Sequence, residues 1–189
     1  PNALRFKSKE TTARIVHFKE FDKISVLGTT IYGAAETGIA ATEFPLTMLT
    51  FMGENISRTK GLLASVGNFL QDKGISIHSL TASDTFVAIY LSQETGDSIY
   101  QELHENFVVR NPVFKGLTKV SGIGELVLSN HLFIEACGVI SMVSETLSRN
   151  GISIIEMVTS HTDIVVYCKY PLINRCVELL KERLGVKGN

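Results

Sequence analysis

An internal repeat constrains the fold of this chain more than any other feature. Shifting the sequence by 77 residues aligns Gly61 with Gly138 without gaps. It also aligns the tetrapeptide Gly-Ile-Ser-Ile at residues 74–77 with the identical tetrapeptide at 151–154. Self-similarity at one fixed spacing indicates that a single structural unit is used twice. The 189 residues therefore predict two small domains and not one large domain.

Both copies show the same order of predicted elements. Helices are indicated by apolar residues at three- and four-residue spacing followed by glycine, and strands by short apolar runs between polar turns. The first copy contains strand 48–52, helix 61–71, strands 75–80 and 86–91, a helix around 99–107 and a strand at 113–120. The second copy contains strand 126–128, helix 138–150, strands 152–158 and 164–168, and a helix that ends near 184.

This order predicts an α+β fold of two ferredoxin-like βαββαβ domains, with antiparallel sheets and helices on one face. We expect an N-terminal extension at 1–45, a first domain at 46–122 and a second at 123–189. Too few residues follow the last helix for a closing strand in the second copy. Strand-like runs at 14–18 and 24–27 could complete a sheet, or the open edge could pair with a second subunit.

The stretch 33–42 is rich in small residues and predicts a connecting loop. Three cysteines, Cys137, Cys168 and Cys176, lie in apolar stretches at spacings that match no metal site. They predict buried thiols in a reducing compartment.

Composition narrows the partners that the chain could have. With 18 basic and 19 acidic residues the net charge is −1, which argues against nucleic acid as a partner. No apolar run approaches the roughly 20 residues of a membrane span, and the first residues do not form a signal peptide. We therefore expect a cytoplasmic protein with no membrane partner.

Two short motifs look catalytic without the spacing that catalysis needs. Residues 160–163 read Ser-His-Thr-Asp, but the members of a catalytic triad converge from separated elements. Residues 121–124 read Ser-Gly-Ile-Gly, which lacks the third glycine of a nucleotide-binding loop and precedes a strand. The five histidines show no metal-ligand spacing. The sequence predicts no catalytic residues, no metal and no cofactor in this chain.

Residues 61–64, 74–78 and 81–84 resemble an ACT domain, a small amino-acid-sensing module, and in particular the first ACT repeat of aspartokinases. Residues 128–130, 136–139 and 157–160 resemble the second repeat of the same family. The resemblance covers about residues 46–185 and implies the regulatory, C-terminal portion of an aspartokinase. The kinase domain of that family has no counterpart here. If the chain is part of a longer protein, the implied activity is aspartate kinase.

The resemblance implies an amino-acid effector (lysine, threonine or another amino acid) bound at an ACT-domain interface, and allosteric control of an aspartokinase-like enzyme of amino-acid biosynthesis. The implied partners are a second copy of the chain, giving a homodimer, and a kinase domain or subunit. Lysine-sensing members tend to carry an acid where this chain has His78, which weighs against lysine. The implied effector contacts are Ile56, Thr59, Gly61, Leu62, Leu63, Ser76, Ile77, His78, Ala82, Ser83 and Asp84.

In the second copy, the candidate contacts are Asn130, Gly138, Ser153 and Ser160. The resemblance implies that this copy supports dimerisation more than effector binding. Two alternatives stay open at this point. The chain could be a structural oligomerisation module without a ligand, or a free-standing ACT regulator of another enzyme or of transcription.

Overall fold

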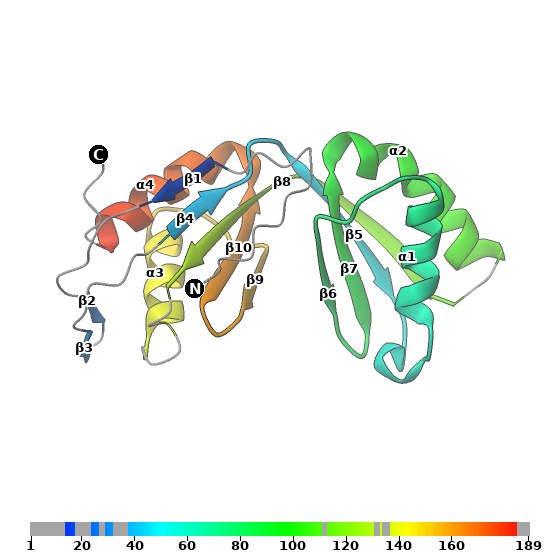
Figure 1. Cartoon of the computed structure of the whole chain (residues 1–189), viewed down its shortest axis with the longest axis horizontal. Helices are drawn as coiled ribbons and strands as arrows, with labels where there is room; N and C mark the ends of the chain where they lie inside the picture. The colour runs from blue at the N-terminus through cyan, green and yellow to red at the C-terminus, as the bar shows by residue number, and fades with distance from the viewer. Residues whose placement is uncertain are drawn as a thin grey trace. The chain divides into compact units, whose positions relative to one another are not determined.

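The computed structural model describes residues 14–17, 24–26, 29–31, 38–110, 113–130, 133 and 137–184. They divide into two compact units (Figure 1). Residues 44–123 form what we call the first-copy unit. The described parts of residues 1–43 and 124–189 form the second-copy unit.

An antiparallel sheet of four strands and two helices builds the first-copy unit. The strands lie in the order β8-β5-β7-β6, and every neighbouring pair is antiparallel. A 3-10 turn, Ile56–Arg58, precedes α1, and a π-helical turn, Glu105–Arg110, extends α2. The elements are β5 (Leu46–Met52), α1 (Leu62–Asp72), β6 (Ser79–Ala82), β7 (Phe86–Ser92), α2 (Gln93–His104) and the first part of β8 (Gly116–Ser129).

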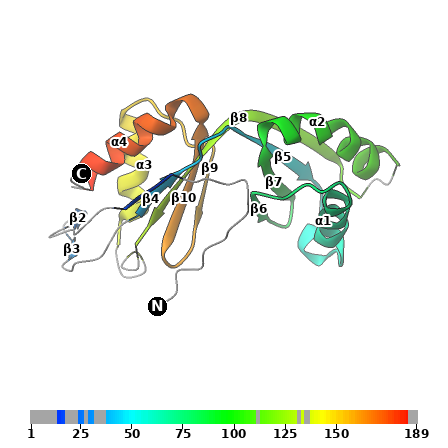
Figure 2. The same cartoon turned by 45° about the horizontal axis from the view of Figure 1, so that its top comes forward.

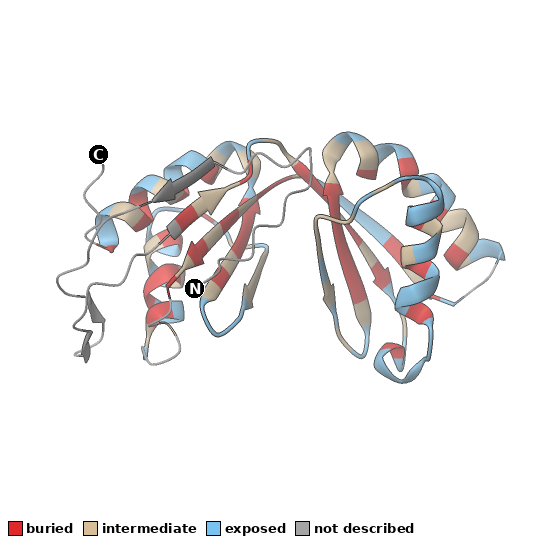
Figure 3. Ribbon diagram, viewed as in Figure 1, coloured by how far each residue is buried: buried red, intermediate tan, exposed pale blue. Residues whose placement is uncertain are grey.

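Both helices of this unit pack on the same face of its sheet, because apolar residues alternate along the strands. Leu49 and Phe51 of β5 are buried against Val66 of α1 and Leu103 of α2 in one apolar cluster. Figure 3 shows buried residues along the strands and on both helices of this unit. Burying a side chain of this size stabilises the fold by roughly 1.5–3 kcal/mol. The predicted antiparallel sheet with helices on one face is confirmed for this unit.

The second-copy unit has the same arrangement, but two strands of its sheet, β1 and β4, come from the N-terminal segment (Figure 2). In its sheet β10 lies between β8 and β9, and β4 pairs antiparallel with β8 on the other side. β1 continues the sheet beyond β4, while β2 and β3 form a separate hairpin. The elements are β1 (Arg14–His17), β2 (Ile24–Val26), β3 (Thr29–Ile31), β4 (Gly38–Ala41), the last part of β8, α3 (Val139–Arg149), β9 (Glu156–Thr159), β10 (Asp163–Lys169), the 3-10 turn Tyr170–Leu172 and α4 (Ile173–Arg183).

The prediction of a loop at 33–42 is wrong for residues 38–41, which form strand β4. Ile39 is only 1% exposed and belongs to the core of the second-copy unit. Small neighbours suggested a loop, but pairing with β8 supplies the hydrogen bonds that make this segment a strand. Residues 33–37 lie outside the described part of the chain.

The prediction that one of the runs at 14–18 and 24–27 could complete a sheet is confirmed for the first run, because β1 joins the second-copy sheet through β4. The strand directly beside β8 is β4, however, and the second run contains β2 of the separate hairpin. The strands predicted at 75–80 and 152–158 begin late, at Ser79 and Glu156. The apolar residues before them, such as Ile75 and Ile152, pack against the cores without strand pairing. Residues after 184 lie outside the described part.

The 77-residue offset of the sequence recurs in the backbone. The bounds of α1 and α3, of β6 and β9, and of β7 and β10 each differ by this offset. Gly61 and Gly138 precede the equivalent helices at φ 79° and 87°, and Gly74 and Gly151 follow them at φ 69° and 71°. These left-handed conformations are strained for residues with a Cβ. The repeated glycines therefore fix where each of these helices begins and ends.

Where a helix crosses the sheet, each copy pairs a glycine with a larger residue. The glycine is on the helix in the first copy and on the strand in the second. In the first copy a Cβ on Gly96 of α2 would lie 2.6 Å from Cβ of Thr47 on β5. At the equivalent crossing Gly124 is on the strand, and a Cβ there would lie 3.1 Å from Cδ1 of Ile173 on α4. Each crossing therefore leaves space for one side chain only.

Replacing Gly96 by isoleucine should overpack the first crossing and lower the free energy of unfolding by about 1–3 kcal/mol. The double variant Thr47→Gly/Gly96→Ile copies the second crossing and should recover part of this loss. Urea denaturation measures both. The control is Gly67→Ala in α1, where a Cβ meets nothing within 4 Å. It should gain up to ~1 kcal/mol from helix propensity. A Gly96→Ile protein as stable as the parent would show that the crossing is not tight.

Candidate functional site

The loop that connects β5 to α1 is tied to the turn between β6 and β7. The backbone N–H of Gly53 donates to the carbonyl of Thr85 at 2.9 Å, and that of Ile56 donates to the carbonyl of Asp84 at 3.0 Å. The Ser57 hydroxyl donates to Oδ1 of Asp84 at 2.6 Å. We call residues 53–61 with residues 82–85 the loop–turn junction. It brings together the predicted site residues at positions 56, 59, 61 and 82–84.

The second copy builds the same junction. The N–H of Asn130 donates to the carbonyl of Thr162 at 2.8 Å, the bond that Gly53 makes with Thr85 in the first copy. The Ser160 hydroxyl accepts from the N–H of Asp163 at 3.0 Å. Ser83 accepts from the N–H of Phe86 in the same way, at 3.1 Å. The serines singled out in the sequence therefore have a structural role in each copy, as acceptors that close the turn.

Helix α1 begins without a capping side chain. Gly61 is its N-cap residue and has no side chain to accept from the first-turn N–H groups. By contrast, α2 begins at Ser92, whose side chain accepts from the N–H of Thr95. Leu63, in the first turn of α1, is 44% exposed. An uncapped, exposed helix start favours a carboxylate or another anion, through its N–H groups and the positive end of the helix dipole.

Charges of both signs surround the loop–turn junction. Glu54, Arg58 and Lys60 are exposed along the loop. Glu54 also forms an ion pair with Lys115, which precedes β8. The junction thus offers partners to both charged groups of a zwitterion.

Leu62, a predicted contact in the first turn of α1, is buried in the core, whereas Leu63 beside it is exposed. The other predicted contacts of the first copy lie elsewhere. Ser76, Ile77 and His78 precede β6, whereas Ser83 and Asp84 follow it. The four residues of β6 span about 13 Å. The N–H of His78 donates to the carbonyl of Tyr90, and the His78 ring lies edge-on to Phe44. Within this unit the predicted contacts therefore form two groups at opposite ends of one strand.

The second-copy candidates are divided in the same way. Asn130 and Ser160 belong to the junction, and Gly138 precedes α3 as its N-cap residue. Ser153 is exposed in the segment before β9. The role of all these residues as effector contacts stays a prediction.

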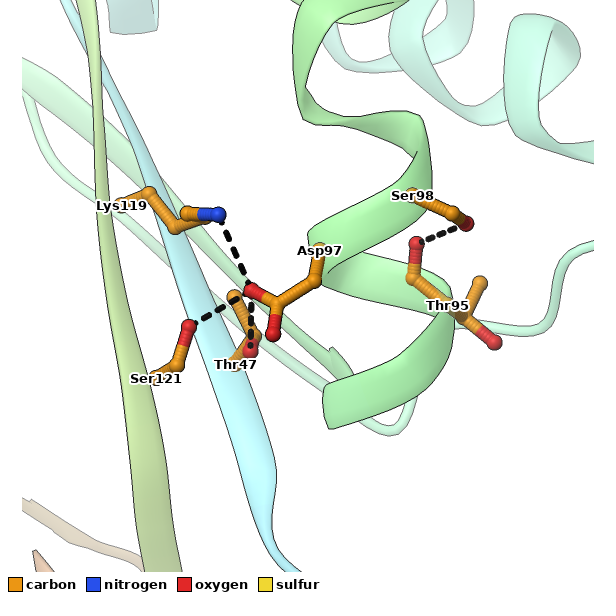
Figure 4. Close-up of polar contacts among 6 residues, drawn as sticks. All are labelled: Thr47, Thr95, Asp97, Ser98, Lys119 and Ser121. Carbon is orange, nitrogen blue, oxygen red and sulfur yellow. Dashed lines mark hydrogen bonds and ion pairs between the residues drawn. The ribbon is translucent and has the colours of Figure 1, made fainter.

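A polar cluster that sequence spacing did not reveal joins α2 to the sheet (Figure 4). Oδ1 of Asp97 accepts from the Ser121 hydroxyl at 2.6 Å, from Lys119 Nζ at 3.1 Å and from the Thr47 hydroxyl at 3.4 Å. The hydrogen bond from Ser121 lowers the pKa of Asp97 most, Lys119 lowers it further, and burial opposes both. Because this carboxylate already has three partners, the cluster fastens α2 to β5 and β8.

The prediction that all three cysteines are buried is wrong for Cys137, which is exposed just before α3. Cys168 and Cys176 are buried, as predicted. Among the described residues, no group of three or more His, Cys, Asp or Glu could hold a metal ion. Of the helices that the structure describes, none is both long and apolar enough to cross a membrane.

No protein-family model and no curated protein matches the chain, but solved structures match its fold. Aspartate kinase from Clostridium acetobutylicum superposes with a TM-score of 0.68 at 11% identity, over 77% of this chain and 34% of that one. The regulatory subunit of aspartate kinase from Thermus flavus gives 0.64 at 12% identity, over 77% and 95%. E. coli aspartokinase III in complex with lysine and aspartate gives 0.57 at 24%, over 77% and 32%.

The chain thus spans about a third of the clostridial and E. coli chains and nearly all of the Thermus subunit. At these identities the likeness is one of fold. In fold, the chain resembles the regulatory portion of aspartate kinases.

Folding lowers the pKa of Asp97, so it favours the ionised carboxylate. The resulting stabilisation is present above the ordinary aspartate pKa of about 4 and is lost as the pH falls through the lower, folded-state pKa. Asp97→Asn should therefore lower stability at pH 7 and flatten its dependence on pH between 7 and 3. Urea midpoints across this range measure the effect.

Ser121→Ala removes the strongest donor to Asp97 and should reproduce part of this flattening. An Asp97→Asn protein with the parent's pH profile would show that the cluster does not couple folding to ionisation.

Proposed function

We propose that this chain is a regulatory protein of two ACT domains, which binds an amino-acid effector and allosterically controls an aspartokinase-like enzyme. Two findings support the proposal. The fold resembles regulatory subunits of aspartate kinase, and the repeated unit keeps its uncapped helix start in both copies. The two compact units correspond in this proposal to the two ACT domains, the second completed by β4.

The uncapped start of α1 is the observation that carries effector binding. The α-carboxylate of an amino acid accepts there from the first-turn N–H groups, which Gly61 leaves without a side-chain acceptor. Leu63 offers an exposed apolar surface to the effector's side chain. Asp84 of the loop–turn junction accepts a hydrogen bond from the Ser57 hydroxyl, and its carboxylate attracts the ammonium group of the effector.

Because the predicted contacts fall into two separate groups, we favour a site that is completed by another molecule of this protein. Residues 76–78 lie at the far end of β6 from the junction, so one unit does not gather both groups around one small molecule. Among the described strands, β6 pairs with β7 alone and β9 with β10 alone. Such open edges pair readily with another chain. We therefore propose a homodimer, with the effector at an interface between ACT domains.

Our proposal for the identity of the effector rests on residue 78. E. coli aspartokinase III has been solved in complex with lysine and aspartate, which are both amino acids. In this chain His78 stands where the resemblance places an acid in lysine sensors. An imidazole carries no negative charge, so it does not neutralise a second ammonium group. We propose an effector without a cationic side chain, such as threonine.

Effector binding controls an enzyme only if the effector binds two states of the assembly with different affinity. In this proposal the states differ in the interface that completes the site. The controlled enzyme is a kinase domain in the same chain or a separate kinase subunit. The Thermus flavus regulatory subunit, matched over 95% of its length, shows that this fold also exists as a separate chain in that protein.

Leu63→Glu should weaken effector binding at least tenfold, because a carboxylate beside the helix start repels the effector's carboxylate. The fold should tolerate it, since Leu63 is exposed and an acid at a helix start is favourable. Thermal shift and calorimetry with each of the twenty amino acids measure binding. The matched control is Ile140→Glu, the equivalent exposed position of α3, which should retain binding.

If Ile140→Glu loses binding and Leu63→Glu does not, the effector site lies in the second-copy unit and not in the first. If no amino acid at millimolar concentration stabilises the parent protein, effector sensing is wrong and the structural module becomes the better hypothesis.

Sedimentation velocity should show a dimer at micromolar concentration. The resemblance assigns dimerisation to the second copy, so a lysine at Val158 of β9 should shift the protein towards monomer. Thr81→Lys, at the equivalent position of β6, should leave the protein dimeric through its second-copy units but weaken effector binding, because it alters the β6 edge that completes the site. A monomeric parent protein, with and without effector, would contradict the proposed assembly.

A further inference from the structure

Two cysteines lie in contact inside the second-copy unit. Cys168 on β10 and Cys176 on α4 are both completely buried, and their sulfur atoms are 3.6 Å apart. The surrounding core is apolar, with Leu128, Val166 and Leu180 in the same cluster. The two thiols therefore face each other where the last helix packs on its sheet.

The first copy shows what packing alone requires at this contact. The 77-residue offset places Leu91 and Ile99 at the positions of Cys168 and Cys176. Both are buried in the core of the first-copy unit. An aliphatic pair fills the same helix–strand contact there, so the fold itself does not need sulfur. In the second copy both members of the pair are cysteine, and the third cysteine, Cys137, is exposed.

We propose that Cys168 and Cys176 are an oxidative modification site, which a small hydroperoxide converts into a reversible intramolecular disulfide. Because the folded protein holds the sulfurs in contact, the second thiol acts at a high effective concentration. This favours the disulfide over further oxidation of either sulfur.

The surroundings assign a role to each sulfur. Cys168 can donate its proton to the carbonyl of Lys169, 3.7 Å away, or to the sulfur of Cys176. The Cys176 neighbour and burial raise the pKa of Cys168. The hydrogen bond from Cys168 lowers the pKa of Cys176. With Cys168 as the donor of the pair, Cys176 is the sulfur that supplies the thiolate, the reactive form of a thiol.

The reaction runs in two steps. Cys176 first releases its proton to water; its thiolate attacks the hydroperoxide, an S–O bond forms, the O–O bond breaks, and the leaving alkoxide takes a proton from water to become an alcohol. Cys168 then attacks the sulfenic sulfur of Cys176, the S–S bond forms, and the leaving hydroxide combines with the Cys168 proton as water. Two thiols lose two electrons, and one hydroperoxide becomes one alcohol and one water.

Forming the disulfide brings the two sulfurs from 3.6 Å to about 2.05 Å. The bond then links α4 covalently to β10, next to the close contact of Ile173 with Gly124 of β8. Oxidation therefore fixes the packing of α4 on its sheet. The hydroperoxide reaches the pair when α4 opens locally, which makes the reaction slow.

The test uses the whole chain with Cys137→Ser, so that the only thiols are the proposed pair. Treatment with hydrogen peroxide should remove both thiols together, with a mass loss of about 2 Da that dithiothreitol reverses. Peptide mapping should place the cross-link between residues 168 and 176. A parallel equilibration with oxidised and reduced glutathione, in urea below the unfolding transition, allows the core to open. Both arms should give the same disulfide.

The matched control adds Cys168→Leu and Cys176→Ile, the pair found in the first copy, and should fold without any mass loss. Cys168→Ser should instead leave a sulfenic acid on Cys176 that dimedone traps, and Cys176→Ser should leave much less. Two free thiols after full equilibration with oxidised glutathione would overturn the proposal. So would addition of two or three oxygen atoms to one cysteine without a cross-link.

Discussion

The structure depends on one long strand, β8, which belongs to both units. Its first part is the closing strand of the first-copy sheet, paired with β5. Its last part is an inner strand of the second-copy sheet, between β4 and β10. The register shifts once along the strand, where Gly122 inserts as an extra residue at φ 76°. The partner of the last part of β8 on the side away from β10 is β4, which comes from the N-terminal segment.

This arrangement explains which parts of the fold the sequence could predict. Helices α1 and α3 were predicted within a residue, because apolar periodicity and flanking glycines are local signals. The strand β4 was missed, because its Gly-Ile-Ala-Ala sequence is strand-like only when β8 is beside it. Ile75 and Ile152 were assigned to strands because burial in an unpaired segment produces the same apolar signal.

The candidate site was predictable only as a set of separate residues. The loop–turn junction depends on backbone hydrogen bonds, such as Ile56 to Asp84, which no residue pattern displays. The Asp97 cluster draws its members from α2, β5 and β8, so no spacing in the sequence connects them. The equivalent crossings Thr47–Gly96 and Gly124–Ile173 show a related limit. The repeat preserves the backbone, while each contact is filled by a different pair of side chains.

The position of β4 has a consequence for how the chain folds. β4 pairs with β8 from Gly38 opposite Ser129 to Ala41 opposite Leu126, so the entire first-copy unit lies between the two strands in the sequence. Closing a disordered loop of that length costs entropy before the pairing forms. Once the first-copy unit has folded, its two ends emerge together, where the N–H of Thr42 donates to the carbonyl of Glu125 at 3.0 Å. A folded first-copy unit therefore lowers the entropy cost of pairing β4 with β8, so the two copies are coupled in folding although each has its own core.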